Sequence, residues 1–338
     1  MKKKILIIGG CGFIGHNLSL FLKGKGYLVN IVDNLGVNNL KSINYEHKNK
    51  NKIKIYKNFL KERLNLLKKN SIKINNIDAK NLNMLKKIFF NIKPDVVIHL
   101  AAVSHADRSN KTPNYTFENS FITLQNTLES IRQLDSHLIF FSSSMVYGDF
   151  EKKTVNEKDI CKPKGIYGTL KYCSELLIKS YSQVFGVKYT IIRPSALYGE
   201  RCISSRVGQI FLEKSLNNEE ITVNGNGSDK LDFTYINDLM MGVYKIIKSK
   251  NSINQIFNIT YGNSRKIQEV LNLVKKNFYN TKVKYIKRDK LVPKRGTLSI
   301  LKAQKLLGYK SMFPLEKGFS RYIEWYKSKK KLFNKNSN

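Results

Sequence analysis

The chain has 338 residues, of which 41 % are hydrophobic, so it can bury the core of one large domain, and global disorder is excluded. Sixty basic residues against 25 acidic ones give a formal charge of +35, which suits a polyanionic partner as well as an anionic substrate. The lysines are scattered among asparagines and isoleucines, and no nucleic-acid-binding motif accompanies them. We therefore expect no specific nucleic-acid partner.

The first half of the chain alternates short apolar segments with amphipathic ones, which is the pattern of a doubly wound parallel sheet. The predicted strands are Ile5–Ile8, Leu28–Val32, Asp95–Leu100 and Leu138–Ser142, and a further one that ends at Ile191–Arg193. The predicted helices between them are Gly12–Leu22, Leu82–Phe90 and Tyr115–Leu134. His99 lies inside a strand and is expected in the core, whereas Glu175, on a later helix, is expected on a solvated face.

A long stretch rich in lysine and asparagine separates Asp33 from Asp78. It contains one plausible helix, Phe59–Lys69, which places three leucines on one face. We interpret the stretch as an insertion in the loop and helix after the second strand, because it is too short for a separate domain.

The strand Ile5–Ile8 runs directly into the segment GGCGFIG, residues 9–15. Glycine is needed there because the turn is tight, because the backbone must approach a pyrophosphate closely, and because helix and strand must pack without a Cβ between them. The pyrophosphate then lies at the N-terminus of the following helix, where free N–H groups favour an anion. The residues expected to contact a dinucleotide here are Gly9, Gly12, Phe13, Ile14 and Gly15.

Asp33, at the end of the second strand, indicates which dinucleotide is bound. Its carboxylate can accept hydrogen bonds from the adenosine ribose hydroxyls and would repel a 2′-phosphate. The neighbouring Asn34, also assigned to the cofactor site, and Leu35 supply no compensating arginine, so NAD is favoured over NADP. Asp78, after the third strand, either contacts the adenine or is a solvated loop residue.

After Ser195 the alternation of strands and helices weakens, and glycines and polar residues mark loops. The predicted fold class is therefore α/β: a Rossmann-type doubly wound parallel sheet binds NAD over residues 1–194, and later segments return a strand and a helix to it. Residues 195–330 are expected to form a smaller C-terminal substrate-binding portion, which threads back at Leu231–Tyr235. Residues 331–338 form a basic tail.

The four cysteines form neither a Cys-x-x-Cys pair nor a cluster with histidine at zinc spacing, so reduced thiols and no metal are expected. The apolar run Ile5–Ile8 is too short for a signal peptide, and no segment approaches the length of a membrane span. These patterns predict a cytoplasmic protein that has no membrane partner.

Tyr167 and Lys171 lie four residues apart, so a helix brings both side chains to one face. A free tyrosine has a pKa of about 10, but an adjacent ammonium and the positive nicotinamide of NAD lower that pKa toward the range of a general base. Lys171 is also expected to hold the nicotinamide ribose. Ser143, at the end of the preceding strand, offers a hydroxyl that can share the proton being moved. These three are the predicted catalytic residues.

Six segments, in order, resemble motifs of the extended short-chain dehydrogenase/reductase family of nucleotide-sugar epimerases and dehydratases, and the resemblance covers nearly the whole chain. The segments are GGCGFIG, VIHLAAVSHADRS, FSSSMVYG, YGTLK, RPSALYG and LDFTYINDL. The resemblance implies that Tyr167 takes the proton of the sugar 4-hydroxyl while C4 gives a hydride to NAD, and that Ser143 hydrogen-bonds the same hydroxyl. It also implies that Ala101 and Ala102 line the cofactor and that Asn119 matches the family's asparagine on the long helix after the fourth strand.

The residues after Ser143 depart from the dehydratases of this family. Those enzymes carry an acidic residue or an Asp-Glu pair there, to move the C5 proton and expel the 6-hydroxyl as water, whereas this chain has Ser144 and Met145. Neither side chain can act as a general acid or base. The resemblance therefore favours an NAD-dependent 4-epimerase of a UDP-hexose or UDP-hexuronate, which needs only reversible hydride transfer and rotation of the 4-keto sugar.

Two alternatives stay open. The segment SHADRS at 104–109 is dehydratase-like, so a 4,6-dehydratase or a decarboxylase with acid and base groups from elsewhere is the nearest rival. A non-catalytic Rossmann protein that binds nucleic acid through its charge belongs to another class. The intact serine, tyrosine and lysine argue against it, because a pure binding module has no use for them.

The family normally places an arginine before the aspartate of the RDF-type motif, where it holds the substrate pyrophosphate, but this chain has Leu231 there. Ser195 lies where many relatives have an asparagine near the sugar phosphates. His105 lies in a loop at the carboxyl end of a strand, where such sheets bind ligands, and it is assigned to the substrate together with Ser144. The remaining candidates, each as plausibly a solvated surface residue, are Arg206, Arg288 and Arg295.

Relatives in the family dimerise through two helices of each subunit, and the candidate segments here are Phe117–Leu134 and Leu170–Phe185. Apolar residues recur at helical spacing in the second segment, although part of that stripe is expected to pack on the subunit's own sheet. A homodimer is therefore expected.

Overall fold

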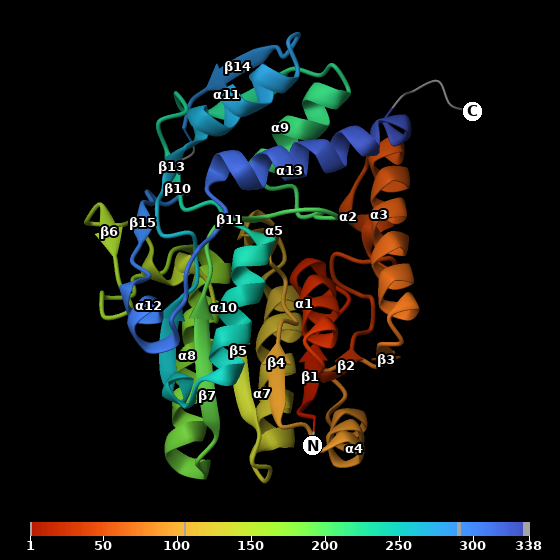
Figure 1. Cartoon of the computed structure of the whole chain (residues 1–338), viewed down its shortest axis with the longest axis vertical. Coiled ribbons are helices and arrows are strands. Elements are labelled where there is room, and N and C mark those ends of the chain that lie inside the picture. The colour runs from red at the N-terminus through yellow and green to blue at the C-terminus, as the bar shows by residue number, and fades with distance from the viewer. Residues whose placement is uncertain (1, 105, 289–291, 334–338) are drawn as a thin grey trace.

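A parallel seven-stranded sheet forms the centre of the protein, which is described here by a computed structural model for residues 2–104, 106–288 and 292–333 (Figure 1). The strand order is β3-β2-β1-β4-β5-β7-β12, so the chain starts in the middle of the sheet and winds outward in both directions. This confirms the predicted doubly wound α/β fold. The strands are β1 (Lys4–Ile8), β2 (Leu28–Val32), β3 (Lys73–Asn75), β4 (Val96–His99), β5 (His137–Phe141), β7 (Lys188–Arg193) and β12 (Gln255–Asn258).

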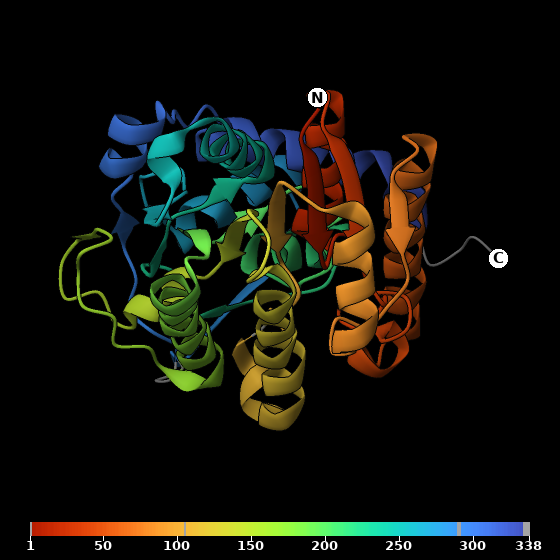
Figure 2. The same ribbon diagram turned by 90° about the horizontal axis from the view of Figure 1, so that it is seen from below.

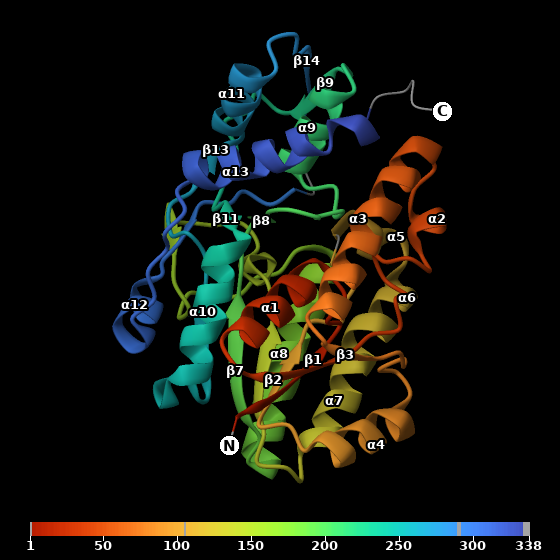
Figure 3. The same ribbon diagram turned by 45° about the vertical axis from the view of Figure 1, so that its right-hand side comes forward.

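Helices cover both faces of this sheet (Figures 2 and 3). Alternate strand residues serve the two faces: Ile5 and Ile7 belong to one buried core, and Leu6 and Ile8 to the other. Among the described helices, none is both long and apolar enough to cross a bilayer. The first core is covered by α1 (Phe13–Gly24) and α10 (Ile236–Lys248), and the second by α4 (Leu82–Ile92), α7 (Thr123–Ile131) and α8 (Gly165–Phe185).

The second half of the chain builds a smaller layer above the carboxyl ends of the strands (Figure 1). The helices of this half, besides α10, are α9 (Val207–Leu216), α11 (Ile267–Asn277), α12 (Leu301–Leu307) and α13 (Leu315–Ser328). Short strands pair as β9 (Ile221–Asn224) with β14 (Val283–Ile286), β10 (Lys230–Leu231) with β13 (Arg265–Lys266), β8 (Leu197–Tyr198) with β11 (Thr234–Tyr235), and β6 (Thr154–Val155) with β15 (Thr297–Leu298). Strand β12 and helix α10 return from this half to the main sheet.

The insertion after β2 contains the short helix α2 (Ile43–Glu46) and the long helix α3 (Lys50–Lys69). Helix α3 begins well before the predicted start at Phe59. Its N-terminus is capped by Asn49, whose side chain accepts a hydrogen bond from a backbone N–H, and Tyr56 extends the buried face. In the first half of α3 the lysines outnumber the buried residues. The amphipathic pattern of this half was therefore not recognised in the sequence.

Helix α3 is part of the main core. Phe59 is 0 % exposed, and its ring centroid lies 4.7 Å from that of Trp325 on α13. The hydroxyl of Tyr56 donates to the carboxylate of Glu213 on α9 at 2.9 Å. The insertion thus joins the sheet half to the smaller layer.

The long helix predicted at Tyr115–Leu134 is interrupted by a π-helical turn. Helix α5 (Ala106–Lys111) precedes it, α6 (Pro113–Phe117) starts it, the π turn covers Glu118–Ile122, and α7 completes it. Such turns often occur at functional sites, and this one carries Asn119, whose amide donates to the carbonyl of Tyr115 at 2.8 Å.

The beginning of the predicted basic tail packs on the protein. Helix α13 runs to Ser328, a 3₁₀ turn covers Lys330–Leu332, and Phe333 is buried with its ring 5.8 Å from that of Tyr326. Residues 334–338 lie outside the described part of the chain.

Replacing Phe59 by alanine is expected to lower the free energy of unfolding by about 3 kcal/mol, because it leaves a cavity between α3 and α13. Asn58→Ala, on the exposed side of the same helix, is the matched control and is expected to cost less than about 1 kcal/mol. Urea unfolding followed by circular dichroism measures both. A separate, early transition for α3 in the unchanged protein would contradict its place in the main core.

The buried imidazole of His99 makes stability depend on pH. It is 0 % exposed, as predicted for a core residue, and burial, assisted by the charge of Lys171, lowers its pKa to about 3. Between about pH 3 and the ordinary histidine pKa of about 6.5, the unfolded chain binds a proton that the folded chain does not. Stability is therefore lost as the pH falls through this window. In His99→Asn, the loss in unfolding free energy between pH 7.5 and pH 5 is expected to be roughly 2 kcal/mol smaller; an equal loss in both proteins would show that His99 does not carry it.

Candidate active site

The glycine loop between β1 and α1 is shaped by close backbone contacts. Gly9 has a φ of +82°, and a Cβ there would lie 2.7 Å from the backbone nitrogen of Ala101. A Cβ on Gly15 would lie 2.6 Å from the Cα of Gly10. The loop can therefore close only with glycine at these two positions, and it leads directly into the N-terminus of α1.

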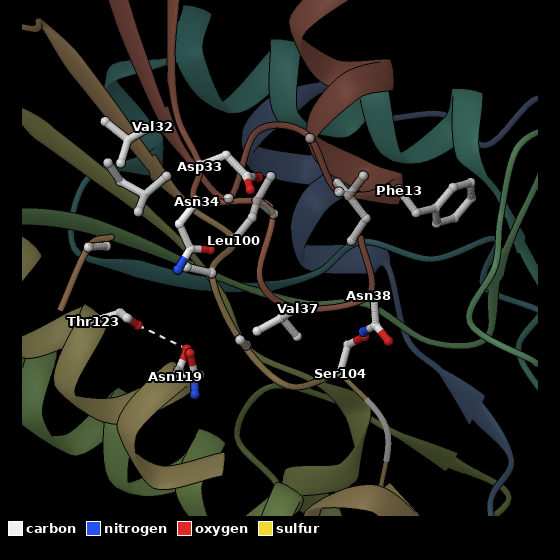
Figure 4. A pocket seen from close by; sticks show the side chains of 18 of the residues that line it. Phe13, Val32, Asp33, Asn34, Val37, Asn38, Leu100, Ser104, Asn119 and Thr123 are labelled. Carbon is white, nitrogen blue, oxygen red and sulfur yellow. Dashed lines mark hydrogen bonds between the residues drawn. The ribbon is translucent and has the colours of Figure 1, made fainter. Parts of the chain in front are cut away.

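A pocket forms where the glycine loop meets the carboxyl ends of β2 and β4 (Figure 4). Asn119, which the family resemblance singled out, also lines it, from the π turn before α7. All of the residues that sequence reasoning assigned to the cofactor alone line this one pocket: Gly9, Gly12, Phe13, Ile14, Gly15, Asp33, Asn34, Asp78, Ala101 and Ala102.

Asp33 is held in place by two backbone donors. One carboxylate oxygen accepts from the Cys11 N–H at 2.8 Å and the other from the Leu35 N–H at 2.7 Å. Burial raises the pKa of Asp33, and these hydrogen bonds act against the increase. Each oxygen keeps a further lone pair for a ribose hydroxyl. The glycine cradle and this carboxylate together fit a dinucleotide without a 2′-phosphate.

Ser143, Tyr167 and Lys171 line a second cavity of about 640 Å³, which shares residues such as Ile14 and Arg206 with the first pocket. Ser143 follows β5, and Tyr167 and Lys171 lie on the first turns of α8. The catalytic residues predicted from sequence are thus brought to one wall. A cavity of this size suits a small-molecule substrate.

Lys171 is buried, and its ammonium donates to the carbonyl of Phe141 at 2.7 Å. Burial lowers its pKa to about 8. Burial also raises the pKa of Tyr167, while the charge of Arg206 and hydrogen bonding with Ser143 act to lower it. Tyr167 therefore needs further positive charge before it can act as a base near neutral pH.

Glu175 is not on a solvated face, so that prediction was wrong. It is 0 % exposed and forms a bidentate ion pair with Arg193, at 2.6 Å and 3.0 Å, while the Ser142 hydroxyl donates to it at 2.5 Å. The helical spacing did indicate a position near the site, because Glu175 follows the catalytic Lys171 by one helical turn. Its partner, however, lies on β7. The pair ties the end of β5, next to Ser143, to the helix that carries Tyr167.

The substrate residues predicted from sequence separate into two groups. Ser144, Ser195, Arg206 and Arg295 line the larger cavity, as does Leu231, the residue in place of the family's arginine. Arg288 does not line it, and pairs instead with Asp229 at 2.9 Å. His105 lies outside the described residues.

Arg295 is the most unusual of these side chains. Its Nε is buried and has no hydrogen-bond partner among the described residues. Burial and the neighbouring charge of Arg206 lower its pKa to about 10. Two adjacent guanidinium groups on the wall of a cavity form a site for an anionic group with several oxygen atoms.

Sequence reasoning missed two features of these cavities. Asp107 of α5 lies on the wall of the larger cavity, and Arg63 of α3 lies on the wall of the pocket at the glycine loop. Asp107 belongs to the dehydratase-like segment SHADRS, which could have singled it out, whereas Arg63 belongs to none of the six family segments. Asp232, within the segment LDFTY, is 0 % exposed and accepts hydrogen bonds from Thr260 and Gly262, which fixes the segment whose Leu231 and Phe233 line the cavity.

The pocket, the catalytic wall and the six sequence segments agree with one protein family, whose model matches residues 5–260. The chain belongs to the NAD-dependent epimerase/dehydratase family. The family's cofactor is NAD, in agreement with the prediction from Asp33. The resemblance seen in the sequence is thereby confirmed.

Relatives with different activities are similar to this chain. A UDP-glucuronate 4-epimerase from Thermodesulfobacterium geofontis is 26 % identical over 325 residues, which cover 95 % of both chains. A dTDP-D-glucose 4,6-dehydratase from Dictyostelium discoideum is 30 % identical over 279 residues, which cover 76 % of this chain and 58 % of that protein. Identity alone therefore does not separate the two reactions.

The fold is also similar to a crystal structure of UDP-glucuronic acid 4-epimerase from Bacillus cereus in complex with UDP-glucuronic acid and NAD. The TM-score is 0.85 at 26 % identity, and the match covers 96 % of this chain and 99 % of that one. The smaller layer and the insertion are thus part of an arrangement that such proteins share.

Glu175→Gln is expected to lower the free energy of unfolding by about 3 kcal/mol, because it leaves the Arg193 guanidinium buried without a counter-charge. The matched control is Glu118→Gln, which removes the half-exposed ion pair with Lys80 and is expected to cost at most about 1 kcal/mol. Chemical unfolding of both variants at pH 7 provides the comparison. Equal costs would mean that burial does not determine the strength of the Glu175 pair.

Proposed function

We propose that this protein is an NAD-dependent 4-epimerase of a UDP-linked hexose or hexuronate, which oxidises C4 transiently and reduces it again. The observation that carries the proposal is the single cavity that holds Ser143, Tyr167 and Lys171, with Ser144 and Met145 on the same wall. A catalytic base for hydroxyl oxidation is present there, and the acidic group of a dehydratase is absent from its usual place.

Three residues of the cavity are proposed to take part in proton transfer, each with a different role. Bound NAD supplies the hydride acceptor and a positive ring. Tyr167 takes the proton from the oxygen of the 4-hydroxyl, and Ser143 donates a hydrogen bond to the same oxygen. Lys171 stabilises the Tyr167 phenolate by its charge, and it holds the nicotinamide ribose in place of the Phe141 carbonyl that it contacts in this structure.

The substrate's diphosphate is assigned to Arg206 and Arg295. Both guanidinium groups line the cavity, and Arg295 has an unused buried N–H. They take the role of the family's arginine, whose position is occupied by Leu231 in this chain. Ser195 is placed near the sugar phosphates, and Ser144 near the sugar. UDP is proposed as the carrier because similar structures bind UDP-sugars.

A second candidate function is a 4,6-dehydratase or a decarboxylase. It is favoured by Asp107, the one carboxylate among the described residues that line the cavity, and by the similarity to a dehydratase. Asp107 is exposed, however, and lies on α5, away from the segment that follows Ser143. We therefore place this reaction second.

A homodimer and a cytoplasmic location are also proposed. Large apolar side chains remain exposed along α6 and α8, the segments predicted to pair between subunits, and a four-helix contact would cover them. The side chains are Phe117, Leu176, Val184 and Phe185.

The first test is a proton NMR time course of the purified protein with NAD and UDP-glucose, UDP-N-acetylglucosamine, UDP-glucuronate or dTDP-glucose. We expect the C4 epimer of one UDP-sugar, with the rate reduced at least about 100-fold in Tyr167→Phe, because the general base is lost. A 4-keto-6-deoxy product or a pentose, absent with Asp107→Asn, would establish the second candidate. No reaction with any of these substrates would contradict both.

A further inference from the structure

Arg63 occupies an unusual place for an arginine. It lies on α3, within the insertion that interrupts the Rossmann pattern, and it is only 1 % exposed. Its Nε donates to the carbonyl oxygen of Arg201 at 3.1 Å, and its Nη2 donates to the same oxygen. One neutral acceptor therefore serves both donors.

The charge of Arg63 has no counter-charge within ion-pair distance among the described residues. Burial lowers its pKa only to about 10, so the guanidinium is charged at neutral pH. The other deeply buried arginine near the site, Arg193, has its carboxylate partner in Glu175. An isolated buried charge is costly in free energy, and such groups persist where a partner or ligand compensates them.

The position of Arg63 indicates which ligand compensates it. Its side chain lines the pocket that the glycine loop forms, where it lies close enough to the carboxylate of Asp33 for the two charges to attract each other. The glycine loop and the first residues of α1 line the same pocket, and the free N–H groups of a helix N-terminus favour an anion. A dinucleotide that follows the glycine loop places its pyrophosphate there.

We propose that Arg63 binds the pyrophosphate of the dinucleotide, as a ligand supplied by the insertion and facing the glycine loop. The proposal rests on the NAD site of the proposed function, but not on the identity of the sugar or the reaction. A pyrophosphate is favoured over a 2′-phosphate because the carboxylate of Asp33 occupies the ribose end of the pocket and would repel the latter.

Two consequences distinguish this role from a purely structural one. If Arg63 only held the loop at Arg201, its replacement would weaken the binding of all ligands of the pocket to the same extent. If Arg63 binds pyrophosphate, its replacement weakens ligands that carry the two phosphates and leaves adenosine unaffected. Glutamine is the informative substitution, because it can keep a donor for the Arg201 carbonyl while it removes the charge and the remaining guanidinium donors.

The experiment is isothermal titration of the full chain, freed of bound nucleotide, with NAD, NADP and adenosine. For Arg63→Gln we expect the dissociation constant for NAD to rise roughly 10- to 100-fold, since a charged hydrogen bond is lost, and that for adenosine to change less than about 2-fold. Arg265→Gln is the control: its side chain pairs with Glu269 and Glu316 and does not line the pocket, so NAD affinity is expected to stay within about 2-fold.

Three results would overturn the proposal: an equal loss of affinity for NAD and for adenosine, an unchanged affinity for NAD, or a loss of affinity confined to NADP. Should Arg63→Gln not fold, Arg63→Lys keeps the charge but replaces the planar guanidinium fork by a single nitrogen, which fits the Arg201 carbonyl and a pyrophosphate less well at the same time. We then expect the affinity for NAD alone to fall several-fold. A parallel fall in the affinity for adenosine would again contradict the proposal. If the unchanged protein does not bind NAD, the proposed function fails, which is a different result from a failure of Arg63.

Discussion

All strands of the central sheet run in the same direction, and the site depends on this. Their carboxyl ends meet at one edge, where β1 delivers the glycine loop, β2 delivers Asp33, and β5 delivers Ser143. Residues that are far apart in the chain therefore become neighbours without any of them needing an unusual local structure. The smaller layer lies over this edge and closes it into two connected cavities. The architecture thus explains why the cofactor pocket and the catalytic cavity lie at the same edge of the sheet.

The buried charges of the molecule follow a simple division. Where a buried cation has a carboxylate partner, as Arg193 has Glu175, the pair lies beneath the site and connects strands to helices. Where a buried cation has none, as for Arg63 and Arg295, the side chain lies on a cavity wall. Removing a charge from water costs free energy in both cases, so we infer that the unpaired groups stand where a bound anion compensates them. Unpaired buried charge is therefore a useful marker of the binding surfaces in this fold.

Much of the fold and the centre of the site could be predicted from the sequence, because their signals are local. The glycine loop, the Tyr167 and Lys171 spacing, and the strands of the first half are each visible within a few residues. Glu175 was misjudged because the partner that makes its burial possible, Arg193, lies on another element. The role of Arg63 was invisible for the same reason, since nothing within α3 shows what its guanidinium faces. Local patterns thus identify the donors of a site, but three-dimensional proximity determines which charges remain uncompensated.

One side chain, Arg206, lies on the walls of both cavities and stands at the start of α9. The loop before it is held by α3, through the Arg63 contact with Arg201 and the Lys52 ammonium that donates to Ser205 at 3.3 Å. Arg206 therefore belongs to the boundary between the two cavities. If binding of one ligand orders this boundary, the second ligand binds without that free-energy cost. Thermodynamic linkage makes the effect equal in both directions. For two ligands that both order this boundary, linkage therefore predicts that each binds more tightly while the other is present.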